Sequence, residues 1–110
     1  MDNKQRILNM IGLAQKAGKI ASGEFSTEKA VKTGKAYRVI VAGDSSDNTK
    51  KMFSDMCTYY KLPLIFTGTK ETLGHAIGCE FRACAAVTDR GFAQSIEQCV
   101  RVSDGEKESV

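Results

Sequence analysis

Residues 37–42 read Tyr-Arg-Val-Ile-Val-Ala, a run that is rich in β-branched residues and has no polar alternation after Arg38. A strand with one face in water alternates apolar and polar side chains, whereas a strand covered on both faces is apolar throughout. The run therefore predicts a central buried strand, which the turn residues from Gly43 to Ser46 bring to an end.

Outward from this strand, helical and extended patterns alternate along the chain. They predict helices over residues 3–17 and about 24–33, one that Asp47 or Asn48 caps and that ends before Pro63, one that Gly78 closes, and one that Asp89 caps. They also predict short buried strands at 64–66 and 84–87, and an edge strand at 19–22 whose Ser22-Gly23 end caps the second helix. Such alternation is typical of the α/β class, here as a single-domain three-layer α/β/α sandwich.

Length and composition set the domain organisation and exclude several classes of protein. The 110 residues, 42% hydrophobic and 26% charged, are typical of one globular domain rather than of a disordered chain or a disulfide scaffold. We predict a domain over residues 1–102 and a polar, disordered tail over 103–110. Because the sequence shows neither an apolar run long enough for a membrane span nor a signal peptide, we expect a soluble, cytoplasmic protein.

The sequence carries no strong motif of an enzyme or of a cofactor site. The four cysteines lack CxxC spacing, so no metal site is expected, and Cys57, Cys84 and Cys99 fall in apolar phases that would bury them. No glycine-rich phosphate-binding motif occurs, which argues against a nucleotide cofactor. His75 and Cys79 are four residues apart with a helix stop between them, and a surface histidine and a loop cysteine are favoured over a catalytic pair. We therefore expect a non-catalytic protein without a cofactor.

Positive charge is concentrated in the first third of the chain, although the formal net charge is only +3. Residues 1–38 carry eight Lys and Arg against three Asp and Glu, whereas the other 72 residues carry eight against ten. A basic segment attracts polyanions, but lysines also solubilise helix faces. Charge alone leaves both interpretations open.

The second predicted helix combines an aromatic ring with cations. If Ala30 and Val31 face the sheet, Phe25, Lys29 and Lys32 share the outer face. Phosphates bind lysines and helix N-termini, and an exposed phenyl ring stacks on an unpaired base for about 1–3 kcal/mol. RNA would satisfy these groups together. The alternative is that Phe25 packs in the core and the lysines are merely solvated.

The chain carries a set of different short motifs at specific distances from one another: Gly18-Lys19-Ile20, Gly23 with Lys29-Ala30, Gly34, Cys57 with Lys61 and Pro63, and Lys70, Leu73-Gly74, Ala76, Gly78 and Glu80. Over residues 5–100 this set resembles the ribosomal-protein family that binds kink-turn RNA, the L-seven-Ae and L-thirty-e group. Residues 48–49 and 87–93 look most like its bacterial YlxQ-like branch. The resemblance implies an α/β/α sandwich around a small mixed sheet.

The resemblance also implies an RNA surface in two parts. The first is the turn and start of the second helix, from Gly23 to Lys29, and the second is the loop of residues 80–83. The chain departs from the family at Phe25-Ser26, where kink-turn binders usually carry Asn-Glu to read base edges. A phenyl ring cannot hydrogen-bond a base edge and serine cannot reach as far as glutamate, so recognition of the kink-turn itself stays open.

These arguments predict a non-catalytic protein that binds ribosomal or other structured RNA, with association with the ribosome as a further expectation. The predicted RNA contacts are Lys19, Gly23, Phe25, Ser26, Lys29 and Lys32, with Phe81, Arg82 and Ala83 on the loop. Arg82 occupies a position that is often small or apolar in the family, and it could stack on a base or bind phosphate. The alternative is a protein-interaction module that kept the fold and lost the RNA, with Phe25 and Phe81 as anchors.

Overall fold

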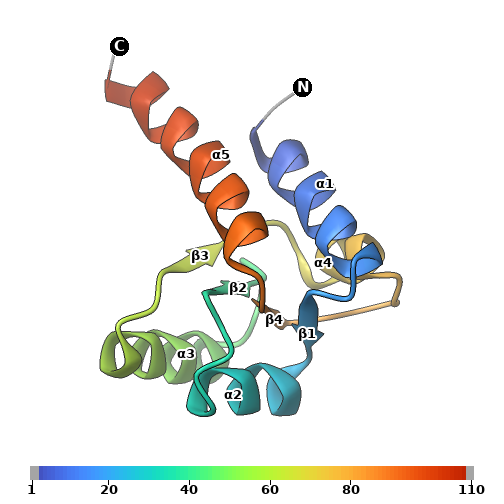
Figure 1. The fold of residues 1–110 in the computed structure, drawn as a ribbon, viewed down its shortest axis with the longest axis vertical. Helices are drawn as coiled ribbons and strands as arrows, with labels where there is room; N and C mark the ends of the chain where they lie inside the picture. Colours follow the sequence, from blue (N-terminus) through green and yellow to red (C-terminus); the bar gives the residue numbers. More distant parts are fainter. Residues whose placement is uncertain (1–2, 109–110) are drawn as a thin grey trace.

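A computed structural model describes residues 3–108 and shows a four-stranded sheet between two layers of helices (Figure 1). The helices are α1 (Asn3–Lys16), α2 (Glu24–Lys32), α3 (Asp47–Tyr60), α4 (Lys70–Ile77) and α5 (Arg90–Glu108). The strands are β1 (Ile20–Ser22), β2 (Arg38–Val41), β3 (Leu64–Phe66) and β4 (Cys84–Val87). The predicted single-domain α/β/α sandwich is therefore confirmed.

The sheet has the strand order β1-β4-β2-β3 and is mixed. Strand β2 pairs parallel with β3 and antiparallel with β4, and β4 pairs antiparallel with β1. All residues of β2 and β4 are buried, as the sequence predicts for two-sided strands. The predicted strand at 64–66 is confirmed as β3, but its predicted burial is wrong, because β3 has a neighbour on one side only. Its last residue, Phe66, is 46% exposed.

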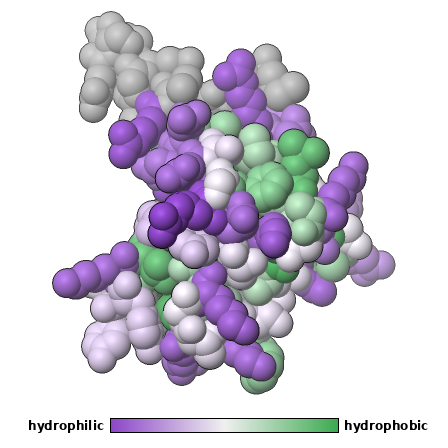
Figure 2. Space-filling view, in the orientation of Figure 1, coloured by the Kyte–Doolittle hydropathy of each residue, from purple (hydrophilic) through white to green (hydrophobic). Residues whose placement is uncertain are grey.

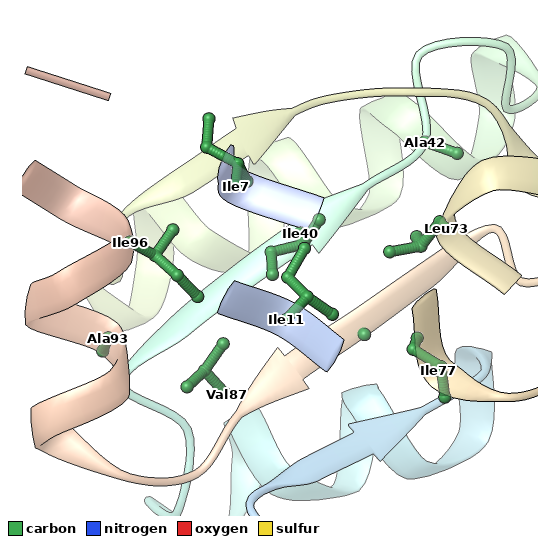
Figure 3. Packing of buried hydrophobic residues seen from close by; sticks show 10 residues of the cluster. Ile7, Ile11, Ile40, Ala42, Leu73, Ile77, Val87, Ala93 and Ile96 are labelled. Atoms are coloured by element: carbon green, nitrogen blue, oxygen red, sulfur yellow. The ribbon is translucent and has the colours of Figure 1, made fainter. Parts of the chain in front are cut away.

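The two faces of the sheet carry separate apolar clusters, because successive side chains of a strand point to opposite faces. Ile40 and Val87 belong to the cluster beneath α1, α4 and α5, in which Ile11 from α1 packs between strands and helices (Figure 3). Val39 and Ala86 belong to the cluster shared with α2 and α3. Helices α2 and α3 thus form one layer, with the other three helices on the opposite face (Figure 1).

The N-terminus of α2 is not capped by a side chain, which differs from the predicted Ser22-Gly23 cap. Gly23 is the N-cap residue, with a φ of 89° that favours glycine, and no side chain of residues 3–108 caps this end. The hydroxyl of Ser22 instead accepts a hydrogen bond of 3.2 Å from Nε of Arg82. Ser22, which the sequence predicts as part of the cap of α2, therefore holds the loop after α4 instead.

The N-termini of α3 and α5 test two further predicted caps. Helix α3 is capped by Ser46, whose Oγ accepts from the backbone N–H of Thr49 at 3.2 Å, rather than by Asp47 or Asn48. Asp89 caps α5 as predicted, because its carboxylate accepts from a backbone N–H of the first turn at 3.0 Å.

The last helix extends beyond residue 102, where the sequence predicts the end of the domain. Its backbone continues to Glu108, whereas the sequence places a disordered tail from residue 103. No proline interrupts this stretch, and a single glycine such as Gly105 costs a helix only about 1 kcal/mol. Residues 109–110 of the predicted tail lie outside the described residues. Between residues 3 and 108, no helix combines the length and the apolar character that crossing a bilayer would take.

Candidate nucleic-acid interface

Helix α2 buries one face and presents the other to solvent. Thr27, Ala30 and Val31 are buried against the sheet, where the sequence places them. Phe25 is 79% exposed, so the alternative in which its ring packs in the core is excluded. The exposed ring and Lys29 lie one helical turn apart and are therefore neighbours on the outer surface of α2.

The outer face of α2 forms a shallow hollow of about 300 Å³ whose lining includes Phe25, Lys29 and Lys32. Lys32 donates to the Glu28 carboxylate at 2.6 Å, and this contact raises the pKa of the lysine. Among the residues described, Lys29 has no such carboxylate partner. Lys29 is therefore the cation in the hollow whose charge is not already balanced.

The start of α2 also presents backbone donors. Within the described part of the chain, no hydrogen bond occupies the N–H groups of Glu24, Phe25 and Ser26, because this end has no side-chain cap. The Glu24 carboxylate turns to α3 and accepts from Thr49 Oγ1 at 3.2 Å. Free N–H groups and the positive end of the helix dipole favour an anion at this position.

The loop of residues 80–83 is attached beside the start of α2. Arg82 donates to Ser22 through Nε and to the Phe81 carbonyl through an Nη atom at 2.8 Å. The carbonyl of Ala83 accepts from Ser45 Oγ at 3.1 Å and from the backbone N–H of Ala42, the residue after β2, at 2.8 Å. Because Gly23 N–H donates to the first residue of β4 at 3.0 Å, the two predicted parts of the surface are adjacent.

Close packing of α4 against this loop fixes its path. A Cβ at Gly74 would lie 2.7 Å from the Glu80 carbonyl oxygen and 2.8 Å from Cα of Phe81, so only glycine fits without movement. The Arg82 N–H donates to the Lys70 carbonyl at 3.0 Å. The loop is therefore held from α4 as well as from β1.

The structure brings most of the predicted contact residues together. Phe25, Ser26 and Lys29 are exposed on α2, and Phe81 is 61% exposed on the loop. Lys19 is the exception, since it precedes β1 at the end opposite Ser22, and its carbonyl accepts from Thr88. Arg82 is partly buried in its bonded position, so its first role is to hold the loop.

Sequence reasoning missed the residues that hold this surface together. Ser22, Ser45 and Thr49 join elements that are far apart in the chain, over separations of 60, 38 and 25 residues. No local pattern distinguishes these serines and threonines, because in the sequence each of them looks like an ordinary turn or cap residue. Gly74 had a signal, since it belongs to the motif Leu73-Gly74 on which the family resemblance rests.

Cys79 and His75 lie in different surroundings. Cys79 packs partly buried against the cluster beneath α4, whereas the exposed His75 lines a separate hollow between α1 and α4. No hydrogen bond among the described residues joins the two side chains. In the same part of the chain, no group of three or more His, Cys, Asp or Glu is arranged to hold a metal ion.

Thiol labelling at pH 8 is expected to separate the cysteines into two classes. Burial raises the pKa of the Cys57 and Cys84 thiols from 9.0 to about 11, which lowers their thiolate fraction about hundredfold. Cys79 and Cys99 are partly exposed, and we expect iodoacetamide to modify them first. Mass spectrometry of the folded and urea-unfolded protein tests this. Equal labelling of all four cysteines in the folded protein would contradict it.

The model of the ribosomal protein L7Ae/L30e/S12e/Gadd45 family matches residues 5–97 of the chain. The chain belongs to this family. It is 40% identical over 87 residues to the RNA-binding protein YlxQ of Bacillus subtilis (strain 168), a match that covers 79% of this chain and 87% of that protein. It is 36% identical over 98 residues to the RNA-binding protein YlxQ of Enterococcus faecium, covering 89% and 94% of the two chains.

Two solved structures share the fold of this chain. A protein of unknown function from Bacillus halodurans C superposes with a TM-score of 0.83 at 34% identity, covering 86% of this chain and 96% of that one. The Giardia lamblia 15.5kD RNA binding protein superposes with a TM-score of 0.78 at 22% identity, covering 94% and 88%, and shows the shared fold. The resemblance read from the sequence is therefore confirmed.

Proposed function

We propose that this protein is a non-catalytic RNA-binding protein that binds structured or kinked RNA through the N-terminus of α2 and the loop after α4. The observation that carries the proposal is the exposed Phe25 ring beside the uncompensated Lys29 and the free N–H groups of α2. Family relatives support it, since two of them bear the name RNA-binding protein YlxQ. The target that we propose is ribosomal or another structured RNA, with association with the ribosome as part of the proposal.

Each group on the surface has a distinct role in this proposal. Phosphate oxygens bind Lys29 and the first N–H groups of α2, which supplies affinity that falls as salt rises. Phe25 stacks on an unpaired base, and Phe81 covers a second base from the loop. Because the side chain of Phe25 has no hydrogen-bonding group, the protein reads the bent shape of the RNA rather than the edges of its bases.

Replacing Lys29 by alanine tests the electrostatic part of the proposal. We expect weaker binding to a kinked duplex RNA and a slope of log K against log salt that is smaller by about one unit, because one phosphate contact is lost. The measurement is fluorescence anisotropy at several salt concentrations. The control is Lys16→Ala, which removes an exposed lysine from α1 in the opposite helix layer.

The same titrations distinguish the alternative function. Equal effects of Lys29→Ala and Lys16→Ala would remove Lys29 from the RNA surface. No binding of kinked, straight or single-stranded RNA at low salt would overturn the proposal. In that case the exposed rings of Phe25 and Phe81 become anchors for a protein partner.

A further inference from the structure

Two tyrosines at the end of α3 form an exposed aromatic pair. The rings of Tyr59 and Tyr60 have centroids 4.9 Å apart and meet edge to face at 77°. Tyr59 is 78% exposed and Tyr60 is 39% exposed, although tyrosines of a small domain usually bury much of their rings. This pair plays no part in either apolar cluster as described above.

The tyrosine pair lies beside the C-terminal end of α2. Helices α2 and α3 form one layer under the sheet, and their starts are joined by the hydrogen bond between Glu24 and Thr49 (Figure 1). Towards the other end, Val31 and Cys57 share one buried cluster, within a turn of Lys32 and Tyr60 respectively. The Glu28 carboxylate is the main cause of the raised pKa of Lys32, and the Tyr60 phenol is the smallest contributor.

The outer surface of this layer therefore carries aromatic rings at both ends with lysines between them. Phe25 lies at the start, Lys29 and Lys32 follow along α2, and the tyrosine pair ends the row. Lys61 follows the pair in the left-handed conformation, with φ 58°, and its side chain is exposed. Hydrophilic side chains project along this lower side of the molecule in the space-filling view (Figure 2).

Resting on the RNA-binding function proposed above, we propose that Tyr59 and Tyr60 are a second stacking platform, for unpaired nucleotides that extend from the structured RNA. Aromatic rings interleaved with lysines are the pattern by which proteins bind single strands without reading their sequence. The negative end of the α3 dipole disfavours phosphate, so at this end the tyrosine rings contact the bases of the strand rather than its phosphates. Lys32 and Lys61 are the lysines nearest the RNA backbone. From Phe25 to Lys32 the surface spans about 10 Å along α2, within reach of a few nucleotides.

The experiment compares a kinked duplex RNA with the same duplex carrying about five unpaired adenosines at either strand end, by fluorescence anisotropy. The extension at one strand end and the extension at the other are tested as two separate RNAs. We expect the protein to bind at least one of them at least about fivefold more tightly than the duplex alone. The double variant Tyr59→Ala/Tyr60→Ala should lose this gain and keep the affinity for the plain duplex. The variant Tyr59→Phe/Tyr60→Phe should retain the gain, because it keeps both rings.

A tyrosine immediately before β2, whose ring is covered from α5, provides the matched control. Tyr37 is 41% exposed, close to the exposure of Tyr60, but its ring lies under Arg90 of α5. Tyr37→Ala should keep the gain from the extension. No gain in the unaltered protein, or a gain that survives removal of both tyrosines, would overturn the platform while leaving duplex binding intact. Failure to bind either RNA would instead overturn the proposed RNA-binding function.

Discussion

Replacing Glu97 by alanine is expected to lower the free energy of unfolding by about 1–3 kcal/mol, less than for a fully buried pair because the Glu97 side chain is 36% exposed. The Glu97 carboxylate pairs with the guanidinium of Arg38, whose side chain is only 4% exposed at the start of β2. Burial lowers the pKa of Arg38, and its Nε already lacks a hydrogen-bond partner among the described residues. Without the carboxylate, a buried positive charge would have no counter-charge.

Chemical denaturation measures this loss, and two other variants separate charge from packing. Arg38→Met removes the buried charge itself, and we expect a change within about 1 kcal/mol. Asp55→Ala breaks an exposed ion pair with Lys51 and should cost at most about 0.5 kcal/mol. If Glu97→Ala proves as mild as Asp55→Ala, then Arg38 is hydrated when its partner is absent and the argument from burial is wrong.

Replacing Gly74 by alanine is expected to move the loop of residues 80–83 and to lower both stability and RNA affinity. The new methyl group would collide with the backbone of Glu80 and Phe81, and such overpacking costs about 1–3 kcal/mol even though alanine is the better helix former. Because the proposed surface needs the loop beside α2, we expect RNA affinity to fall about tenfold or more, the value of one stacked base.

A second helical glycine provides the control for this prediction. A Cβ at Gly12 would lie 3.3 Å from the carbonyl oxygen of Ala76, so Gly12→Ala also crowds α4 but does not touch the loop. It should leave RNA affinity unchanged, because α1 and the Ala76 carbonyl lie away from the loop. Wild-type RNA affinity for Gly74→Ala, measured on folded protein, would show that the loop does not contribute to binding.

Local patterns predicted the elements of this fold because each depends on residues close together in the sequence. The apolar run of residues 39–42 marked the central strand, and the spacing on α2 placed Ala30 and Val31 inward and Phe25 outward. The strand at 64–66 looked equally apolar but lies at the sheet edge, and strand order depends on which segments pair. Likewise, local capping rules assigned Ser22 to α2, whereas tertiary packing gave its hydroxyl to Arg82.

The candidate site was predicted in its parts and assembled only by the fold. The chain alone identified the face with Phe25 and Lys29, and the family resemblance identified residues 80–83. That these parts adjoin depends on the pairing of β1 with β4 and on hydrogen bonds across tens of residues. The same holds for Lys19, which is close in sequence to Gly23 but lies at the opposite end of a short strand.

The sequence by itself determined the α/β class, the buried faces and the family, because these follow from side-chain period and from spaced motifs. Only the tertiary structure decided which exposed groups share a surface. It brought the tyrosines of α3 beside Lys32 of α2, and it left the start of α2 without a cap. The physical reason is that a shared surface depends on how helices pack on the sheet, and one short segment does not encode that packing.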